Sequence, residues 1–193
     1  MHHIIKKVAR LHIQAKRFGR YIYSPKPLGS FRNVRQESRI SQSIKPNGLW
    51  YTCDNEWKEY IQRQNPSWGS SYVHKYLLDV NLNRMCVIRN EKEFLEFNAK
   101  YGVDDRGDMA IDWVKVSKDY DGIEICPYQW EFRMKKKSAW YYSWDVASGC
   151  IWGSSAFKGV TEVENDIKDN EFKDSDSSVD EEYDEGDGWE DWD

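Results

Sequence analysis

The sequence predicts a single α+β domain with a mostly antiparallel sheet core and flanking helices, and three observations support this fold class. Short segments rich in β-branched and aromatic residues alternate with segments whose apolar residues lie three and four positions apart. Glycine, proline and asparagine separate these segments. The chain of 193 residues contains ten Trp, twelve Tyr and seven Phe. Because each aromatic side chain buries about 150–250 Å², a hydrophobic core made largely of these side chains can form without disulfides or metal.

Charge divides the chain into three parts, although the net charge is only −5. Residues 1–39 hold ten basic side chains and one acidic one, whereas residues 162–193 hold sixteen acidic and two basic ones. Acidic segments of this kind are normally disordered. We therefore predict a basic N-terminal helix and linker over 1–39, a globular α+β domain over 40–160, and a disordered acidic tail over 161–193.

The basic N-terminal segment has an apolar stripe with helical spacing. Its members are Ile4, Val8, Leu11, Ala15, Phe18 and Ile22. This pattern predicts an amphipathic helix over 1–23. Three interpretations compete: a helix docked on the domain, a mitochondrial transit segment, or a surface for anionic lipid or nucleic acid.

Within the globular part, local patterns predict the remaining elements. Asp54 and Asn90 stand at the N-cap positions of two helical patterns, and Gly102 follows the second one. The predicted helices span 53–64, 90–101 and 111–120. The predicted strands span 49–52, 72–81, 85–89, 121–125 and, as one or two aromatic strands, 140–152. The segments 24–43, 65–71, 103–109 and 129–138 are predicted to be loops or connections.

Several function classes are disfavoured because their motifs are absent from the sequence. A phosphate-binding G-x-x-x-x-G-K-[ST] loop, a dinucleotide-binding G-x-G-x-x-G and a zinc-binding H-E-x-x-H are all missing. A triad of Ser148, His74 and Asp145 is disfavoured, because Asp145 and Ser148 stand in a pattern that is typical of a turn and a bulge.

The four cysteines are far apart and form no C-x-x-C pair, so we expect reduced thiols. A zinc site that includes His74 has no supporting spacing, and no metal is expected. The sequence shows no signal peptide pattern and no apolar run of membrane-spanning length. We therefore expect an intracellular protein without a transmembrane segment, located in the cytoplasm, with the mitochondrion as the alternative that the basic N-terminus suggests.

The segment 45–52 is the first candidate for a ligand site. Its sequence predicts a tight turn followed by a short strand, in which Trp50 and Tyr51 offer flat rings and Thr52 offers a hydroxyl group. A nucleotide-like ligand requires a stacking surface beside a hydrogen-bonding group. The alternative is a core strand, because aromatic residues also favour strands for packing reasons.

Glu124 is the carboxylate that the sequence singles out. It lies between two isoleucines in a strand that follows a glycine turn, so it is expected to face the opposite side of the sheet from them, and one interpretation places a cleft there. A carboxylate in such a place has either a basic partner or a ligand. The alternative is an exposed glutamate on the open face of the strand. If there is a pocket, Tyr51, Thr52 and Glu124 are predicted to face the same cavity.

Three blocks of sequence, 45–52, 120–125 and 140–152, resemble a family of uncharacterised microbial and viral proteins. More distantly, the arrangement resembles the ADP-ribosyltransferase superfamily. This resemblance implies Glu124 as the catalytic carboxylate, Trp50 or Tyr51 stacked on the nicotinamide of NAD, and Thr52 on the hydroxyl-bearing strand. It also implies a basic group for the pyrophosphate, which is Arg39 or Lys45. The chain departs from the superfamily pattern by having one Thr in place of a Ser-Thr-Ser run, Gly122 two residues before the glutamate, and no histidine at the first strand.

Two non-enzymatic functions are the alternatives to an NAD-using transferase or glycohydrolase. In the first, the protein is an interaction module whose acidic tail docks into a basic groove through Trp189 and Trp192. In the second, the basic segment 133–137, beside Trp130 and Trp140, binds nucleic acid through charge and stacking. A solvated loop is the ordinary explanation of such a basic segment.

Overall fold

The computed structural model describes residues 18–37 and 44–167. Residues 1–17 of the predicted N-terminal helix, Arg39 and the acidic segment 168–193 with its two tryptophans lie outside these ranges. Among the residues that the structure describes, no helix is both long and apolar enough to cross a membrane.

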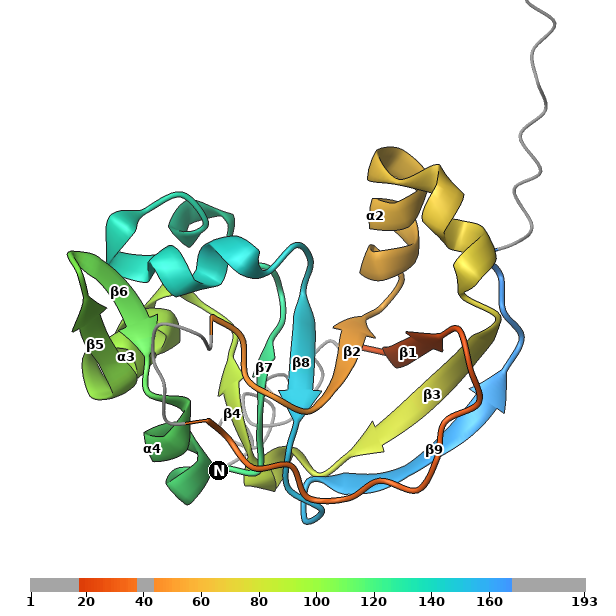
Figure 1. Cartoon of the computed structure of the whole chain (residues 1–193), viewed down its shortest axis with the longest axis horizontal. Coiled ribbons are helices and arrows are strands. Elements are labelled where there is room, and N and C mark those ends of the chain that lie inside the picture. The colour runs from red at the N-terminus through yellow and green to blue at the C-terminus, as the bar shows by residue number, and fades with distance from the viewer. Residues whose placement is uncertain (1–17, 38–43, 168–193) are drawn as a thin grey trace, which may run out of the picture.

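One curled sheet of seven strands organises the fold (Figure 1). The spatial order of its strands is β4-β7-β8-β2-β1-β3-β9. Among the strands that the structure describes in this sheet, only β4 and β7 pair in parallel, and the other pairings are antiparallel. The predicted α+β domain with a mostly antiparallel core is therefore confirmed. The strands are β1 (Arg20–Ser24), β2 (Leu49–Cys53), β3 (His74–Val80), β4 (Met85–Ile88), β7 (Gly122–Ile125), β8 (Ser148–Ile151) and β9 (Phe157–Val163).

Strand β1 lies inside the segment that was predicted to be an N-terminal helix and linker. It pairs with β2 and β3, so that Tyr21 lies opposite Thr52 and Ile22 lies opposite Tyr76. The helix prediction is therefore wrong for residues 20–23, and the sheet already includes residues before the predicted boundary at residue 40. Pairing with two strands that are distant in sequence overrides the helical spacing of the apolar residues.

In the described part of the chain, three α-helices and four short 3₁₀ segments connect the strands. Asn90 caps α3 as predicted, because its side chain accepts a hydrogen bond from the backbone N–H of Glu93 at 3.0 Å. Asp54 does not cap α2; its carboxylate instead accepts the backbone N–H of Gly19 at 2.8 Å, and Asn55 occupies the N-cap. The helical elements are α2 (Glu56–Gln64), α3 (Glu91–Tyr101), α4 (Trp113–Asp119), η2 (Pro66–Ser71), η3 (Leu82–Arg84), η4 (Trp130–Phe132) and η5 (Lys136–Ser143).

Further segments also differ from their predicted structure, and the predicted loop 65–71, for example, forms η2. The acidic segment 103–109 forms most of a hairpin of β5 (Gly102–Asp105) and β6 (Asp108–Ile111), rather than a loop. Its two turn residues, Arg106 and Gly107, have φ of 58° and 91°, and positive φ at both positions is what a two-residue type I′ hairpin turn requires. In the aromatic block 140–152, only β8 is a strand. The first part belongs to η5, where the Trp140 ring packs on α3 with its centroid 5.5 Å from that of Phe94.

The chain remains in the fold beyond the predicted domain end at residue 160. Strand β9 continues to Val163, and Asp166 then binds Lys58 of α2 at 2.8 Å and Lys75 of β3 at 2.6 Å. Residues 161–167 are therefore part of the domain rather than of the predicted tail.

The cysteines also differ from expectation. Cys53 at the end of β2 forms a disulfide with Cys126, which follows β7, while Cys86 and Cys150 are free. The expectation of four reduced thiols is wrong for this pair. The sheet brings the two chain segments together, and cysteine spacing in the sequence carries no information about that pairing.

Candidate functional site

The structure contains a cavity of about 250 Å³ on one face of the sheet, between α2 and the segment that leads into β8. In Figure 1, α2 and the segment η4–η5 stand on the same side of the sheet. Aromatic side chains dominate the walls. The lining residues are Tyr21, Tyr23, Lys45, Trp50, Tyr51, Thr52, Trp57, Tyr72, Asp145, Val146 and Ser148.

Strand register explains why these side chains meet. Tyr21 lies opposite Thr52 in the pairing of β1 with β2, and Thr52 lies opposite Ser148 in the pairing of β2 with β8. Residues that are paired across strands share a face, and so do residues two positions apart in one strand. Tyr23 and Trp50 therefore join the same face.

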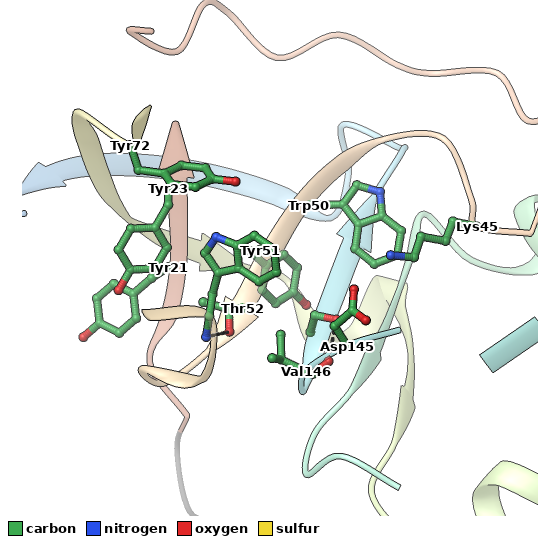
Figure 2. Close-up of a pocket in the computed structure, with 11 residues that line it drawn as sticks. Tyr21, Tyr23, Lys45, Trp50, Tyr51, Thr52, Tyr72, Asp145 and Val146 are labelled. Atoms are coloured by element: carbon green, nitrogen blue, oxygen red, sulfur yellow. Dashed lines mark hydrogen bonds between the residues drawn. The ribbon is translucent and has the colours of Figure 1, made fainter. Parts of the chain in front are cut away.

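The cavity has a tyrosine side and a charged side (Figure 2). Tyr21, Tyr23 and Tyr72 lie on one side, Trp50, Lys45 and Asp145 lie on the other, and Thr52 and Val146 lie between them. The ammonium of Lys45 is 5.3 Å from the centre of the Trp50 ring, a distance typical of a cation–π contact. Burial lowers the pKa of Lys45, and the nearby negative charge of Asp145 partly offsets this effect.

The hydroxyl groups in the cavity walls differ in whether they have hydrogen-bond partners. Thr52 donates to the carbonyl of Ala147 at 3.3 Å and accepts from the backbone N–H of Trp57 at 3.2 Å. These two hydrogen bonds hold the Thr52 side chain against the segment before β8 and against the first turn of α2. Its role as a ligand-binding hydroxyl stays a prediction. The hydroxyl of Tyr23 is buried and has no hydrogen-bond partner among the described residues. Burial also raises the pKa of Tyr23, so this hydroxyl keeps its proton.

Glu124 lies on the opposite face of the sheet from the cavity and is only 2% exposed. Its carboxylate accepts two hydrogen bonds from Arg20, at 2.5 and 2.9 Å, and one from the hydroxyl of Tyr51 at 2.7 Å. Burial alone would lower the pKa of Arg20, but the hydrogen bonds and charge of Glu124 outweigh it and raise the pKa. Burial and the charge of Glu124 both raise the pKa of Tyr51.

A glycine in β8 makes this contact possible. Gly149 lies opposite both Tyr51 and Glu124 in the two strand pairings, so the tyrosine crosses over it to reach the carboxylate. A Cβ atom at Gly149 would lie 2.3 Å from ring carbon Cζ of Tyr51. Tyr51 thus forms part of the cavity wall while its hydroxyl is directed away, to the other side of the sheet.

The predicted site residues are therefore divided between two places. Lys45, Trp50, Tyr51 and Thr52 line the cavity, and Glu124 does not, so the prediction of one shared cavity is wrong for Glu124. The reason is alternation along the strand, since Tyr51 shares a cross-strand row with Glu124 and its neighbour Thr52 faces the other way.

Sequence reasoning missed five residues. The sequence pattern places Tyr21 and Tyr23 in a helix and gives Trp57 and Tyr72 no feature beyond their helix and strand. Arg20 is one of ten basic residues in 1–39, with no pattern that singles it out. The alternation Tyr21-Ile22-Tyr23 is typical of a strand with one buried face, and it is the signal that could have found the two tyrosines.

Other chemistry that the sequence raised is not assembled in the described residues. The ring of His74 lies 2.6 Å from the carboxylate of Glu162, and the hydroxyl of Ser148 donates to the carbonyl of Val146, so no triad forms. Cys53, Glu124 and Cys126 lie close enough to share a metal ion. However, the two sulfurs are joined to each other and the carboxylate is held by Arg20, so the thiolates that zinc requires are absent. Comparison of the chain with protein-family models, with curated proteins and with solved structures finds no match.

Proposed function

We propose that the protein binds a small planar heteroaromatic molecule with an anionic group, of the nucleoside monophosphate class, in the aromatic cavity. The single observation that carries this proposal is the composition of the walls: tyrosine and tryptophan rings on both sides, with a partly buried lysine at one end. Rings of this kind bind flat heterocycles by stacking, which contributes about 1–3 kcal/mol per base.

The volume of the cavity limits the size of the ligand. Pockets for drug-sized ligands measure about 300–1,000 Å³, and this cavity measures about 250 Å³. One ring system with its sugar and phosphate partly outside is in keeping with that volume, whereas an entire dinucleotide is not.

The charges of the cavity favour an anionic ligand over a cationic one. The faces of Tyr21 and Tyr23 already have a cation of the protein nearby, because the ammonium of Lys75 is 4.6 and 5.5 Å from their ring centres. Asp145 is engaged by Arg133 at 3.3 Å. A ligand phosphate would give Lys45 a partner that it lacks among the ion pairs of the described residues, and a charged hydrogen bond of this kind contributes about 1.5–3 kcal/mol.

Isothermal titration of the full-length protein with AMP, adenosine, GMP and nicotinamide mononucleotide tests this proposal. Trp50→Ala should weaken binding of each ring-containing ligand by about 5-fold to 100-fold. Lys45→Gln should weaken the binding of the monophosphates by about 10-fold or more and leave the affinity for adenosine unchanged. Tyr23→Phe should weaken binding by about 5-fold if its hydroxyl bonds the ligand.

The control is Trp68→Ala, since Trp68 is a half-exposed tryptophan that does not line the cavity. Binding of none of the four ligands, or equal losses in Trp50→Ala and Trp68→Ala, would contradict the proposal.

A second candidate, cleavage of the bond between nicotinamide and ribose in NAD, has one observation in its favour. A basic residue, a tyrosine and a glutamate do meet within hydrogen-bonding distance, namely Arg20, Tyr51 and Glu124. A carboxylate near the ribose would stabilise the positive charge that develops as this bond breaks. Because the carboxylate is buried, this reaction requires a rearrangement that exposes it. Nicotinamide release from NAD by the wild type, lost in Glu124→Gln without unfolding, would support this candidate; turnover retained in Glu124→Gln would remove Glu124 from it.

A further inference from the structure

A basic and aromatic surface, formed by residues 130–142 and called the ridge below, adjoins the cavity. Its sequence holds four cations, Arg133 and the three consecutive lysines of 135–137, against the single acid Glu131. The three lysines are exposed, and none of them forms an ion pair with the described part of the chain. Consecutive lysines without acidic partners leave a local positive potential, although the whole chain is negative.

Large apolar side chains are exposed on the same ridge. Trp130 is 68% exposed, Tyr142 is 58% exposed and Met134 is 79% exposed. The Trp130 ring contacts Tyr128 with centroids 4.6 Å apart, and Tyr128 in turn stacks on the buried Tyr141. The Trp130 ring is therefore supported on one side by buried rings, and both Trp130 and Tyr142 are more than half exposed.

Arg133 connects the ridge to the cavity. Its guanidinium lies 5.8 Å from the centre of the Tyr142 ring on the ridge and 3.3 Å from the carboxylate of Asp145, which lines the cavity. Lys45 and Trp50 lie on the same side of the cavity as Asp145 (Figure 2). Contacts thus lead from Asp145 in the cavity wall through Arg133 to the Tyr142 ring, and the three lysines follow Arg133 closely in the chain.

We propose that the cavity and the ridge form one continuous site for single-stranded nucleic acid. One base occupies the cavity, following bases stack on Tyr142 and Trp130, and the phosphates run along Arg133 and the lysines of 135–137. This inference rests on the proposed function of the cavity and extends it to a polymeric ligand.

Single strands fit these observations better than duplexes or acidic peptides. Stacking on exposed rings requires unpaired bases, which a duplex does not present. Lysines alone would suit an acidic peptide, including the acidic segment of this chain. However, two exposed rings beside them, and a cavity of the size of one base, add features that a peptide of Asp and Glu does not use.

Fluorescence anisotropy with labelled oligonucleotides of increasing length tests the inference on the full-length protein. We expect affinity to rise at least about 10-fold from a mononucleotide to a tetranucleotide. With three or four phosphates neutralised, raising salt from about 50 to about 200 mM should weaken the tetranucleotide by about 20-fold to 50-fold. Each of Lys135→Gln, Lys136→Gln and Lys137→Gln should reduce the logarithmic salt slope by about 0.7.

Ring and charge controls separate the ridge from the rest of the surface. Trp130→Ala and Tyr142→Ala should each weaken the tetranucleotide by about 5-fold to 100-fold and leave mononucleotide binding unchanged. Lys158→Gln on β9 and Trp68→Ala on η2 remove exposed residues of the same types away from the ridge and should change neither. Because the substituted ridge side chains are exposed, thermal melts should match those of the wild type.

Each remaining outcome overturns the inference in a recognisable way. The ridge proposal is contradicted if oligonucleotides bind no more tightly than mononucleotides and the three ridge lysine variants have the same affinities as Lys158→Gln. The proposal for the cavity would still stand in that case. If no nucleotide and no oligonucleotide binds, both the cavity proposal and the ridge proposal are contradicted. Binding of a synthetic peptide of residues 180–193 that depends on the three lysines, in the absence of oligonucleotide binding, assigns the ridge to an acidic peptide.

Discussion

At the scale of single residues, the Arg20–Glu124–Tyr51 contact is the most consequential feature of the core. A carboxylate that is 2% exposed has lost nearly all of its water, and burial of an unpaired charge is strongly unfavourable. Two hydrogen bonds from Arg20 and one from Tyr51 replace that water. The Arg20–Glu124 ion pair therefore helps to fix the order of the strands. It joins β1 to β7, and β2 and β8 lie between these two strands.

Removal of one partner should cost far more than removal of both. We expect Arg20→Met to lower the free energy of unfolding by about 3–5 kcal/mol, because it leaves the carboxylate of Glu124 buried without a cation. The double variant Arg20→Met/Glu124→Gln should recover most of that loss, since a neutral amide at position 124 can still accept from Tyr51. Urea unfolding of the two single variants and the double variant measures the coupling. Additive losses would show that the two side chains do not interact.

The sequence identified Glu124 as a strand carboxylate with a basic partner or a ligand, and the structure gives it a basic partner. It could not identify Arg20 as that partner, because the two residues are 104 positions apart and no local pattern relates them. The sequence also picked out Trp50 and Thr52, whose strand pattern was clear. It missed Tyr21 and Tyr23, because the helical spacing of earlier residues continues into β1.

At the scale of elements, prediction from sequence worked where a local signal fixes the structure. Helix α3 has a capping asparagine and an apolar face, so its bounds were predicted to within a residue. The hairpin β5–β6 was missed, because its acidic residues have low strand propensity and only the turn at Arg106 and Gly107 marks it. The aromatic part of η5 was read as a strand, because ring-rich segments suit a strand and a packed turn equally well.

Asp166, near the end of the described chain, forms ion pairs with Lys58 of α2 and Lys75 of β3 and so holds these two elements together. Burial alone would raise its pKa, but the hydrogen bonds from Lys58 and Lys75 outweigh burial and lower the pKa to about 2. An aspartate in an unfolded chain titrates near pH 3.9. Because the pKa is lower in the folded state, its stabilising contribution is complete above about pH 4 and is lost as the pH falls toward about 2.

We therefore expect Asp166→Asn to be less stable than the wild type at pH 6, with a difference that shrinks between pH 4 and pH 2. Urea unfolding at a series of pH values measures this difference. Asp79→Asn is the matched control, since Asp79 is 72% exposed and lies 3.9 Å from Lys158; its effect should be small at every pH. A difference for Asp166→Asn that persists unchanged at pH 2–3 would show that the lysine contacts do not depend on its charge.

At the scale of the whole molecule, the Cys53–Cys126 disulfide joins the two halves of the sheet. Cys53 ends β2 and Cys126 follows β7, so the bond spans β8, which lies between these strands. It also closes a long loop, because the two cysteines are 73 positions apart. Cross-links of this kind stabilise a fold mainly by restricting the unfolded chain, and the effect grows with loop length.

We expect the Cys53→Ala/Cys126→Ala variant to lose about 2–4 kcal/mol of unfolding free energy relative to the oxidised wild type. Dithiothreitol should lower the stability of the wild type and leave the variant unchanged. Thiol counting in denaturant should find two free thiols before reduction and four after it. The denaturant is needed because burial in the folded protein raises the pKa of Cys86 to about 12 and the pKa of Cys150 well above its usual value. The double variant Cys86→Ala/Cys150→Ala is the control, since it should respond to dithiothreitol as the wild type does. Four thiols without reduction would show that the bond does not form, and the contacts of Glu124 with Arg20 and Tyr51 would then be the side-chain links described above that join β7 to β1 and β2.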